Sequence, residues 1–284
     1  MSVGGHDADI WGEDDNASLY EAFARQHPVY RDTSRDLAAL ARLAADAAVV
    51  DLACGTGVTS REILAALGPG GRVTGVDRSA AMLAVAARSV ADLRVTWVQA
   101  PAENIDRHVT GPVDAVVCNS AIWQADLAAT AAAVRNLLVP AGRFVFNMGA
   151  GYLDQQQDPN FGDERLSPVS VMRDIAARDY GWRPPAQAAP PSGRPRPTRD
   201  SICRCLDSAG FDIEQITEFT YHRDADAERD WLSVPVFTKY YLPGLPYQDR
   251  MRVLAKAYAR LGSSEPEPSR WVAFSACVRQ QADR

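Results

Sequence analysis

A glycine-rich turn is the first feature of the sequence whose residue types and spacing could do chemistry. The segment VVDLACGTGVTS, residues 49–60, has an apolar run that includes Asp51, then two glycines, then the start of an expected helix. Gly55 and Gly57 allow a turn too tight for larger side chains, so that backbone amides at the helix N-terminus can face a ligand. The turn therefore predicts a binding site for a nucleoside-like molecule.

A second acidic residue strengthens this prediction. Asp77 ends the next expected strand, RVTGVD, 20 residues beyond Gly57. At this spacing a carboxylate can accept hydrogen bonds from both hydroxyls of a ribose. The dinucleotide fingerprint G-x-G-x-x-G shares the pattern, but its third glycine position holds Ser60 here.

The elements that must position these residues alternate between residues 48 and 149. Short β-branched runs (AVVDLA, RVTGVD, RVTWVQ, VDAVVCN, GRFVFNM) are separated by Ala- and Leu-rich segments of helical composition. This rhythm predicts a β-α-β-α core with a parallel sheet. Residues 113–118 are apolar almost throughout, as expected for a strand covered by helices on both faces.

The motif residues resemble those of the class I S-adenosylmethionine-dependent methyltransferase family. They are Asp51, Cys54, Gly55, Thr56, Gly57, Asp77, Ser79 and Met82, and the resemblance covers about residues 45–148. It implies an α/β fold with a Rossmann-like, doubly wound seven-stranded sheet, the last strand antiparallel, and helical cap insertions. The late strands are expected at about residues 211–222 and 271–279.

The same resemblance implies S-adenosylmethionine as the cofactor and a set of binding residues. The methionine part would lie over residues 51–57, the ribose on Asp77 and the adenine near Met82. The family's Asp-Ala-Glu-like turn has become Pro101-Ala102-Glu103, so adenine recognition would use the backbone after the proline. The implied cofactor-binding residues are Asp51, Ala53, Cys54, Gly55, Gly57, Asp77, Arg78, Met82, Ala102, Glu103 and Asn119.

For the methyl acceptor, the sequence offers aromatic residues and two histidines. Tyr20, Tyr30, Trp123 and Tyr241 are the expected pocket residues, and core packing is the alternative for Trp123. His222 and His27 are the candidate general bases, because imidazole titrates near neutral pH; the alternative is that positioning alone carries the reaction. No metal site is expected, because Asp126 is the sole carboxylate close behind the fourth strand.

The chain is expected to divide into three parts. Residues 1–44 would form an N-terminal helical cap, 45–150 the cofactor-binding core, and 151–284 the remaining core strands with insertions at about 151–200 and 224–268. Segments 1–40, 150–200 and 224–268 would together cover the strand ends. The proline-rich stretch 184–197 has no regular pattern and is expected to be either a lid or a slack loop.

The amino-acid composition limits the kinds of partner that the protein could bind. Lys and Arg number 30 against 36 Asp and Glu, a net charge of −6, which argues against a nucleic-acid footprint. No apolar run approaches the roughly 18 residues of a membrane span, and the acidic start does not match a secretory signal. Five scattered cysteines imply no disulfide framework. A cytoplasmic protein with a small-molecule partner is expected, and homo-oligomer formation is left open.

Three functions remain in play at this point. The first is methyl transfer to an O, N or C atom of a small molecule such as a secondary metabolite. The second is a non-methylating cyclisation or rearrangement on the same fold, since fold does not settle function. The third, a non-catalytic binding subunit, is disfavoured because the glycines and Asp77 are intact.

A cluster of basic residues has two interpretations. The cluster could bind an anionic substrate or could be a solvated segment, and its members are Arg178, Arg183, Arg194, Arg196, Arg199 and Arg204.

Overall fold

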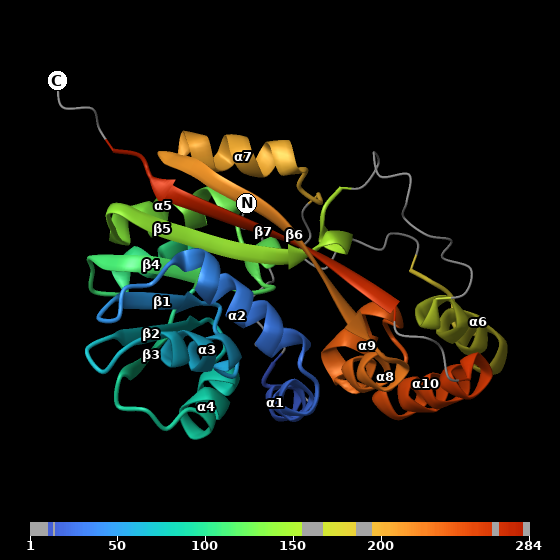
Figure 1. The fold of residues 1–284 in the computed structure, drawn as a ribbon. Coiled ribbons are helices and arrows are strands. Elements are labelled where there is room, and N and C mark those ends of the chain that lie inside the picture. The colour runs from blue at the N-terminus through green and yellow to red at the C-terminus, as the bar shows by residue number, and fades with distance from the viewer. Residues whose placement is uncertain (1–10, 14, 155–166, 186–194, 263–266, 281–284) are drawn as a thin grey trace, which may run out of the picture.

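One mixed sheet of seven strands crosses the part of the molecule that the structure describes (Figure 1). This computed structural model describes residues 11–13, 15–154, 167–185, 195–262 and 267–280. The strands are β1 (Ala48–Leu52), β2 (Arg72–Asp77), β3 (Val95–Gln99), β4 (Val113–Cys118), β5 (Leu138–Gly149), β6 (Phe211–Arg223) and β7 (Glu267–Val278). Their order is β3-β2-β1-β4-β5-β7-β6, and β7 runs antiparallel to both neighbours, which confirms the expected sheet.

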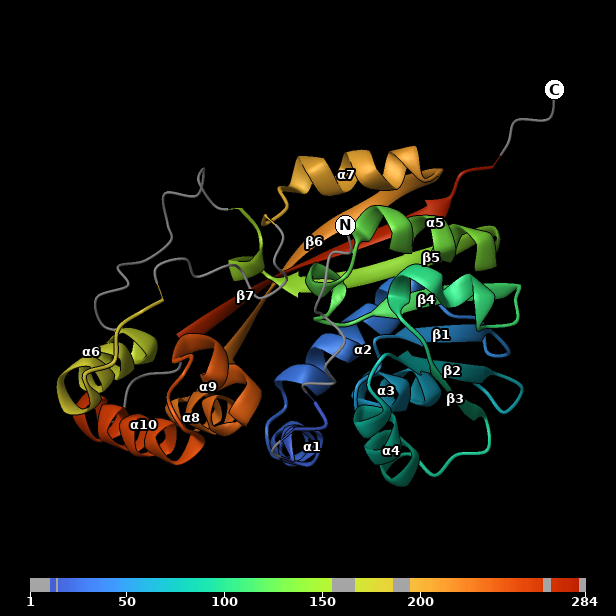
Figure 2. The same cartoon turned by 180° about the vertical axis from the view of Figure 1, so that it is seen from behind.

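Helices cover both faces of the sheet (Figures 1 and 2). One face carries α2 (Val29–Ala41), α3 (Val58–Ala66) and α4 (Ala80–Ser89), and the other carries α5 (Leu127–Leu137) and α7 (Arg199–Ser208). Alternate residues of β4 enter different cores: Val117 packs on the α2 side and Val116 on the α5 side. This double coverage explains why the strand is apolar almost throughout.

Polar caps fix where the helices beside the site begin. The Ser79 hydroxyl accepts a hydrogen bond from the backbone N–H of Met82 at the start of α4, at 3.1 Å. A carboxylate oxygen of Asp126 accepts one from the N–H of Ala129 at the start of α5, at 3.0 Å. Each bond satisfies an amide that the first helical turn leaves unpaired. Both caps therefore hold loops at the ends of parallel strands.

A second body, which we call the cap lobe, is carried by the far ends of β6 and β7 (Figure 1). It consists of α8 (Ala225–Ser233), α9 (Pro235–Tyr241) and α10 (Tyr247–Leu261), together with α6 (Pro168–Tyr180), which packs against α10. Met172 and Ile175 of α6 share an apolar core with Leu232 and Val253. The two late insertions thus fold together, although residues 181–224, which include α7 and β6, separate α6 from α8 in the sequence.

The N-terminal segment differs from the expected cap of residues 1–44. The first helix, α1 (Asn16–Gln26), contacts α8 of the cap lobe, but α2 lies on the sheet. Leu37 and Ala41 of α2 are buried against Ile63 and Val145, because an apolar stripe on α2 faces the sheet core. Among the described N-terminal residues, α1 therefore belongs to the cap and α2 to the sheet core.

Strand β6 explains an irregularity in its sequence pattern. The pairing of β6 with β7 shifts register between Ile213 and Gln215, so one extra residue stands in β6 there. The apolar alternation shifts by one residue at that point, and the strand nevertheless extends from 211 to 223.

Of the expected lid at 184–197, residues 186–194 lie outside the described residues, and Arg194 is one of them. No helix in the described ranges is long and apolar enough to cross a membrane.

Candidate active site

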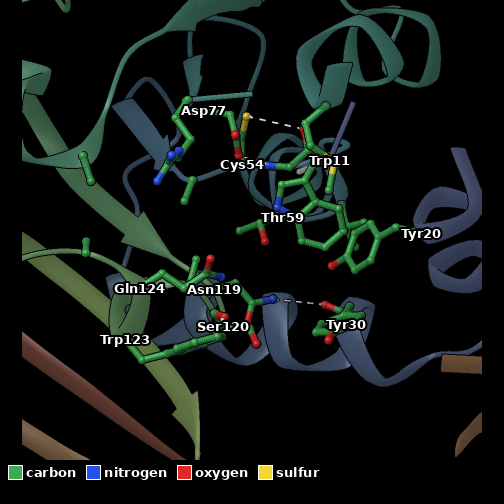
Figure 3. Close-up of a pocket in the computed structure, with 18 of the residues that line it drawn as sticks. Trp11, Tyr20, Tyr30, Cys54, Thr59, Asp77, Asn119, Ser120, Trp123 and Gln124 are labelled. Atoms are coloured by element: carbon green, nitrogen blue, oxygen red, sulfur yellow. Dashed lines mark hydrogen bonds between the residues drawn. The ribbon is translucent and has the colours of Figure 1, made fainter. Parts of the chain in front are cut away.

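A pocket opens at the carboxyl ends of β1, β2 and β4, between the sheet, α1 and the cap lobe (Figure 3). It holds about 1140 Å³ of empty space, part of it open to solvent. The expected site residues that line it are Ala53, Cys54, Gly55, Asp77, Arg78, Met82, Ala102, Glu103, Asn119, Tyr20, Tyr30 and Trp123.

The glycine-rich turn between β1 and α3 forms the floor of this pocket. Gly57 precedes α3 with φ +83°, a left-handed conformation that favours glycine. A Cβ atom at this position would lie 2.9 Å from Val90 Cγ2 and 3.0 Å from Trp97 Cη2. Conformation and packing therefore both require glycine, and the bare backbone of Gly55 is left facing the pocket.

Asp77 connects the two loops that bound the pocket. One carboxylate oxygen accepts a hydrogen bond from the N–H of Gly55 and the other from the N–H of Ser79, each at 2.8 Å. The residue is 8% exposed and lines the pocket. An oriented carboxylate that lines a cavity suits a ligand with two adjacent hydroxyl groups. The residues present thus fit a ribose at this point.

Asp51 supports the turn from beneath and does not line the pocket. The Ser60 hydroxyl donates to one of its carboxylate oxygens at 2.6 Å, and the other oxygen is buried with no partner among the described residues. Burial raises the pKa of Asp51 to about 7, against the opposing effect of the Ser60 hydrogen bond. Asp51 is therefore placed to shape the turn, with a carboxyl group that titrates near neutral pH.

The raised pKa of Asp51 predicts a pH dependence of stability. Unfolded, this carboxyl group ionises near pH 3.8, whereas in the folded chain it keeps its proton up to about pH 7. Folding therefore takes up a proton between these values, and the contribution of Asp51 to stability falls as pH rises through that window. Asp51→Asn should gain roughly 1–3 kcal/mol relative to the parent between about pH 5 and about pH 8, measured by urea unfolding. A difference that stays constant with pH would contradict this assignment.

Two further strand ends complete the polar part of the pocket. A Glu103 carboxylate oxygen accepts from the N–H of Asp126 at 2.8 Å, which holds the turn after β3 beside the turn after β4. The side-chain amide of Asn119 donates to Ser34 Oγ at 2.8 Å and to Thr33 Oγ1 at 3.0 Å. Its Oδ1 is buried and has no partner among the described residues. A ligand ammonium group could satisfy that oxygen.

Neither expected general base reaches the pocket. His27 is buried between α1 and α2, and its Nε2 lies 3.0 Å from an Asp230 carboxylate oxygen in the cap lobe. His222 is exposed on β6, paired in register with Pro268. Tyr241 also stays outside, within the apolar core of the cap lobe. His222 lies far from the pocket because β6 is an edge strand, which β5 and β7 separate from β4.

The thiol in the turn is not an activated nucleophile. Cys54 is buried, and desolvation raises the pKa of its thiol well above the ordinary value, with the Asp51 and Asp77 carboxylates acting in the same direction.

Four aromatic residues that were not among the expected pocket residues also line the cavity: Trp11, Tyr152, Trp231 and Phe237. The sequence feature that could have predicted them is the number of aromatic residues outside the expected sheet strands.

Comparison with known proteins agrees with this geometry. Residues 49–142 match the family model of the methyltransferase domain, and no curated protein matches the chain by sequence. A Haloferax volcanii protein solved with the Trm112 methyltransferase activator is 16% identical, with 96% of this chain and 97% of that chain covered and a TM-score of 0.57.

Two structures with bound ligands share the fold. Haemonchus contortus phosphoethanolamine N-methyltransferase 2, solved with phosphomonomethylethanolamine and S-adenosylhomocysteine, is 17% identical, with 95% of this chain and 58% of that chain covered and a TM-score of 0.55. Geranyl diphosphate C-methyltransferase from Streptomyces coelicolor A3(2), solved with Mg²⁺, geranyl diphosphate and S-adenosylhomocysteine, is 16% identical, with 96% and 86% covered and a TM-score of 0.51. At these identities the likeness is one of fold.

The fold and the site define a class I S-adenosylmethionine-dependent methyltransferase. Over residues 49–142 the chain matches the methyltransferase domain family, and this enzyme class uses S-adenosylmethionine as its cofactor. The predicted enzyme class and cofactor are thereby confirmed.

Proposed function

We propose that this enzyme transfers the methyl group of S-adenosylmethionine to an O, N or C atom of a small molecule. One observation carries the proposal: a single pocket joins the Asp77 end, suited to a nucleoside, to an end walled by aromatic side chains of α1 and the cap lobe. Apolar, concave pockets with few polar groups are typical of small-molecule sites. A macromolecular acceptor would need an open surface beside the methyl group.

The chain's own residues would act by binding and orientation. When bound, S-adenosylmethionine supplies a methyl group already activated for displacement. We assign its ribose to Asp77, its ammonium group to Asn119 Oδ1 and its adenine to the backbone at Ala102 and Glu103, beside Met82. The acceptor would lie against Trp123 on the opposite side, in line with the methyl group. Holding two reactants in line can supply much of the rate.

Histidine variants test whether positioning carries the reaction. No histidine or lysine is among the described residues that line the pocket. We therefore expect His222→Ala and His27→Gln to keep turnover within a few-fold of the parent. Trp123→Ala, which removes a wall of the pocket, should lower turnover about tenfold or more by misaligning the acceptor. A loss of 10²–10⁴-fold in either histidine variant, the usual worth of general base catalysis, would restore histidine to the mechanism.

A partition experiment tests the proposed acceptor class. The purified enzyme is incubated with cell extract and S-adenosylmethionine labelled in the methyl group, and the extract is then separated by ultrafiltration. We expect enzyme-dependent label in the small-molecule fraction. Asp77→Ala serves as the control with a damaged cofactor site. Label that accumulates in protein or nucleic acid instead would contradict a small-molecule acceptor.

A further inference from the structure

Five aromatic residues build one wall of the pocket, which we call the cap wall: Trp11, Tyr20, Tyr30, Trp231 and Phe237. They come from two stretches of the chain, 11–30 and 231–237, and contact one another. The Tyr20 ring lies 5.6 Å from that of Trp11 and 5.4 Å from that of Tyr30, and Phe237 stacks on Trp231 at 4.1 Å. The Trp231 indole N–H also donates a hydrogen bond to the Tyr30 hydroxyl at 3.1 Å, which links α8 of the cap lobe to α2.

A second aromatic wall belongs to the sheet side. Trp123 stacks on Tyr152 with ring centroids 4.1 Å apart and planes 10° apart, and both line the pocket. The Trp123 indole N–H donates to the backbone oxygen of Ser120 at 2.9 Å, which fixes the ring. Figure 3 shows Trp123 across the pocket from Tyr20, with Asn119 and Ser120 between them. The space between the two walls suits a flat ring system.

The charged residues of the pocket are concentrated at the ends of β2 and β3. Among the lining residues that the structure describes, the charged ones are Asp77, Arg78 and Glu103, all at or just beyond the ends of β2 and β3. Of the arginine cluster, the described members Arg178, Arg183, Arg196, Arg199 and Arg204 do not line the pocket. The space between the walls therefore offers no described cation to an anionic substrate.

Tyr20 contributes the polar group of the cap wall that faces the cavity. Its hydroxyl makes no hydrogen bond to any residue in the described ranges, and Figure 3 shows it directed toward the pocket. Burial among the rings raises the pKa of Tyr20 well above the ordinary value, with the Tyr30 hydroxyl the next cause. The phenol is therefore neutral and can donate one hydrogen bond to a ligand. The same desolvation disfavours a charge on the ligand.

We propose that the methyl acceptor is an uncharged molecule with a flat, mainly apolar body, held between the cap wall and the Trp123–Tyr152 stack and oriented by a hydrogen bond with the Tyr20 hydroxyl. The inference rests on the proposed function and narrows its substrate class. An anionic acceptor would find no described cation between the walls, and burial among apolar rings disfavours a charge of either sign. A neutral planar acceptor meets neither penalty.

Three matched probes test the charge preference. Protein saturated with S-adenosylhomocysteine is titrated by calorimetry at neutral pH with 2-naphthol, 2-naphthoate and 2-naphthylmethylammonium, which share one ring system. We expect 2-naphthol to bind at least about tenfold more tightly than either charged probe. Equal or tighter binding of a charged probe, or binding of none of the three, would overturn the inference.

Tyr20→Phe tests the orienting hydroxyl. It should weaken 2-naphthol binding about 2- to 10-fold, the usual worth of one hydrogen bond, and leave S-adenosylhomocysteine binding unchanged. Tyr240→Phe is the matched control, because Tyr240 is exposed on α9 and does not line the pocket. Unchanged affinity in Tyr20→Phe would remove Tyr20 from the proposal. If a charged probe binds best while label still enters the small-molecule fraction, this inference fails and the proposed function stands.

Discussion

Replacing Asp77 with alanine should weaken the binding of S-adenosylmethionine by about 1.5–3 kcal/mol, roughly a 10- to 150-fold loss of affinity. The carboxylate is the oriented acceptor that faces the nucleoside end of the pocket, and it also holds the amides of Gly55 and Ser79 at 2.8 Å. The substitution therefore removes hydrogen bonds to the ligand and loosens the turn that forms the floor. Calorimetry with S-adenosylmethionine measures both effects together.

Two controls make this result interpretable. Asp174→Ala removes an exposed acid from α6, outside the pocket, and should leave affinity unchanged. Circular dichroism of Asp77→Ala should show that the fold is retained. Equal affinity in Asp77→Ala and the parent, with folding intact, would refute the role of Asp77. Tight binding of NAD by the parent would refute the assignment of the site itself.

Gly75→Ala should be the most destabilising small substitution in the sheet. A Cβ atom on Gly75 would lie 2.3 Å from Cζ3 and 2.4 Å from Cε3 of Trp97, its partner on β3, and 3.2 Å from the Cys54 sulfur. The Trp97 ring also covers Gly57, so it has little room to move away. Overpacking of this kind costs about 1–3 kcal/mol. We expect a loss of stability at the upper end of that range, measured by denaturant unfolding.

A smaller partner should relieve the clash. In the background of Trp97→Leu, the additional Gly75→Ala change should cost much less than in the parent, because the ring that blocks the methyl group is gone. Gly151→Ala is the matched control, since a Cβ there meets nothing within 4 Å. If Gly75→Ala is equally harmful with and without Trp97, the close packing of this ring does not explain the glycine.

The cofactor half of the site was predictable because its residues are local in sequence. Gly55, Gly57 and Asp77 lie at the ends of two neighbouring parallel strands, and the strand-turn-helix pattern fixes where such ends meet. What the sequence could not reveal was the support beneath them. Trp97 packs against both Gly57 and Gly75, a contact between strands that no local pattern announces.

The acceptor half depended on tertiary packing and was only partly predictable. The cap wall unites Trp11, Tyr20 and Tyr30 with Trp231 and Phe237, about 200 residues away in sequence, because β6 and β7 carry the cap lobe past the sheet. Tertiary packing also decided the positions of α2 and His222, which differ from the expected ones. The apolar stripe of α2 could serve a cap or a sheet, and the structure places it on the sheet. The place of β6 at the edge of the sheet left His222 outside the pocket.

Ligands bound in two structures that share the fold carry a charge for which the described pocket offers little complement. Phosphomonomethylethanolamine and geranyl diphosphate, bound in two of those structures, carry phosphate groups. The described residues between the aromatic walls here include no lysine or arginine.

Mass spectrometry with a deuterated methyl donor tests the central claim most directly. The enzyme is incubated with a small-molecule extract and S-adenosylmethionine whose methyl group carries three deuterium atoms, and products are compared with those of Asp77→Ala. Methyl transfer predicts a small-molecule product that contains the intact deuterated methyl group, formed in equal amount with S-adenosylhomocysteine. A product that is an unlabelled isomer of its precursor, formed while the methyl donor stays intact, would contradict methyl transfer and identify a rearrangement or cyclisation instead.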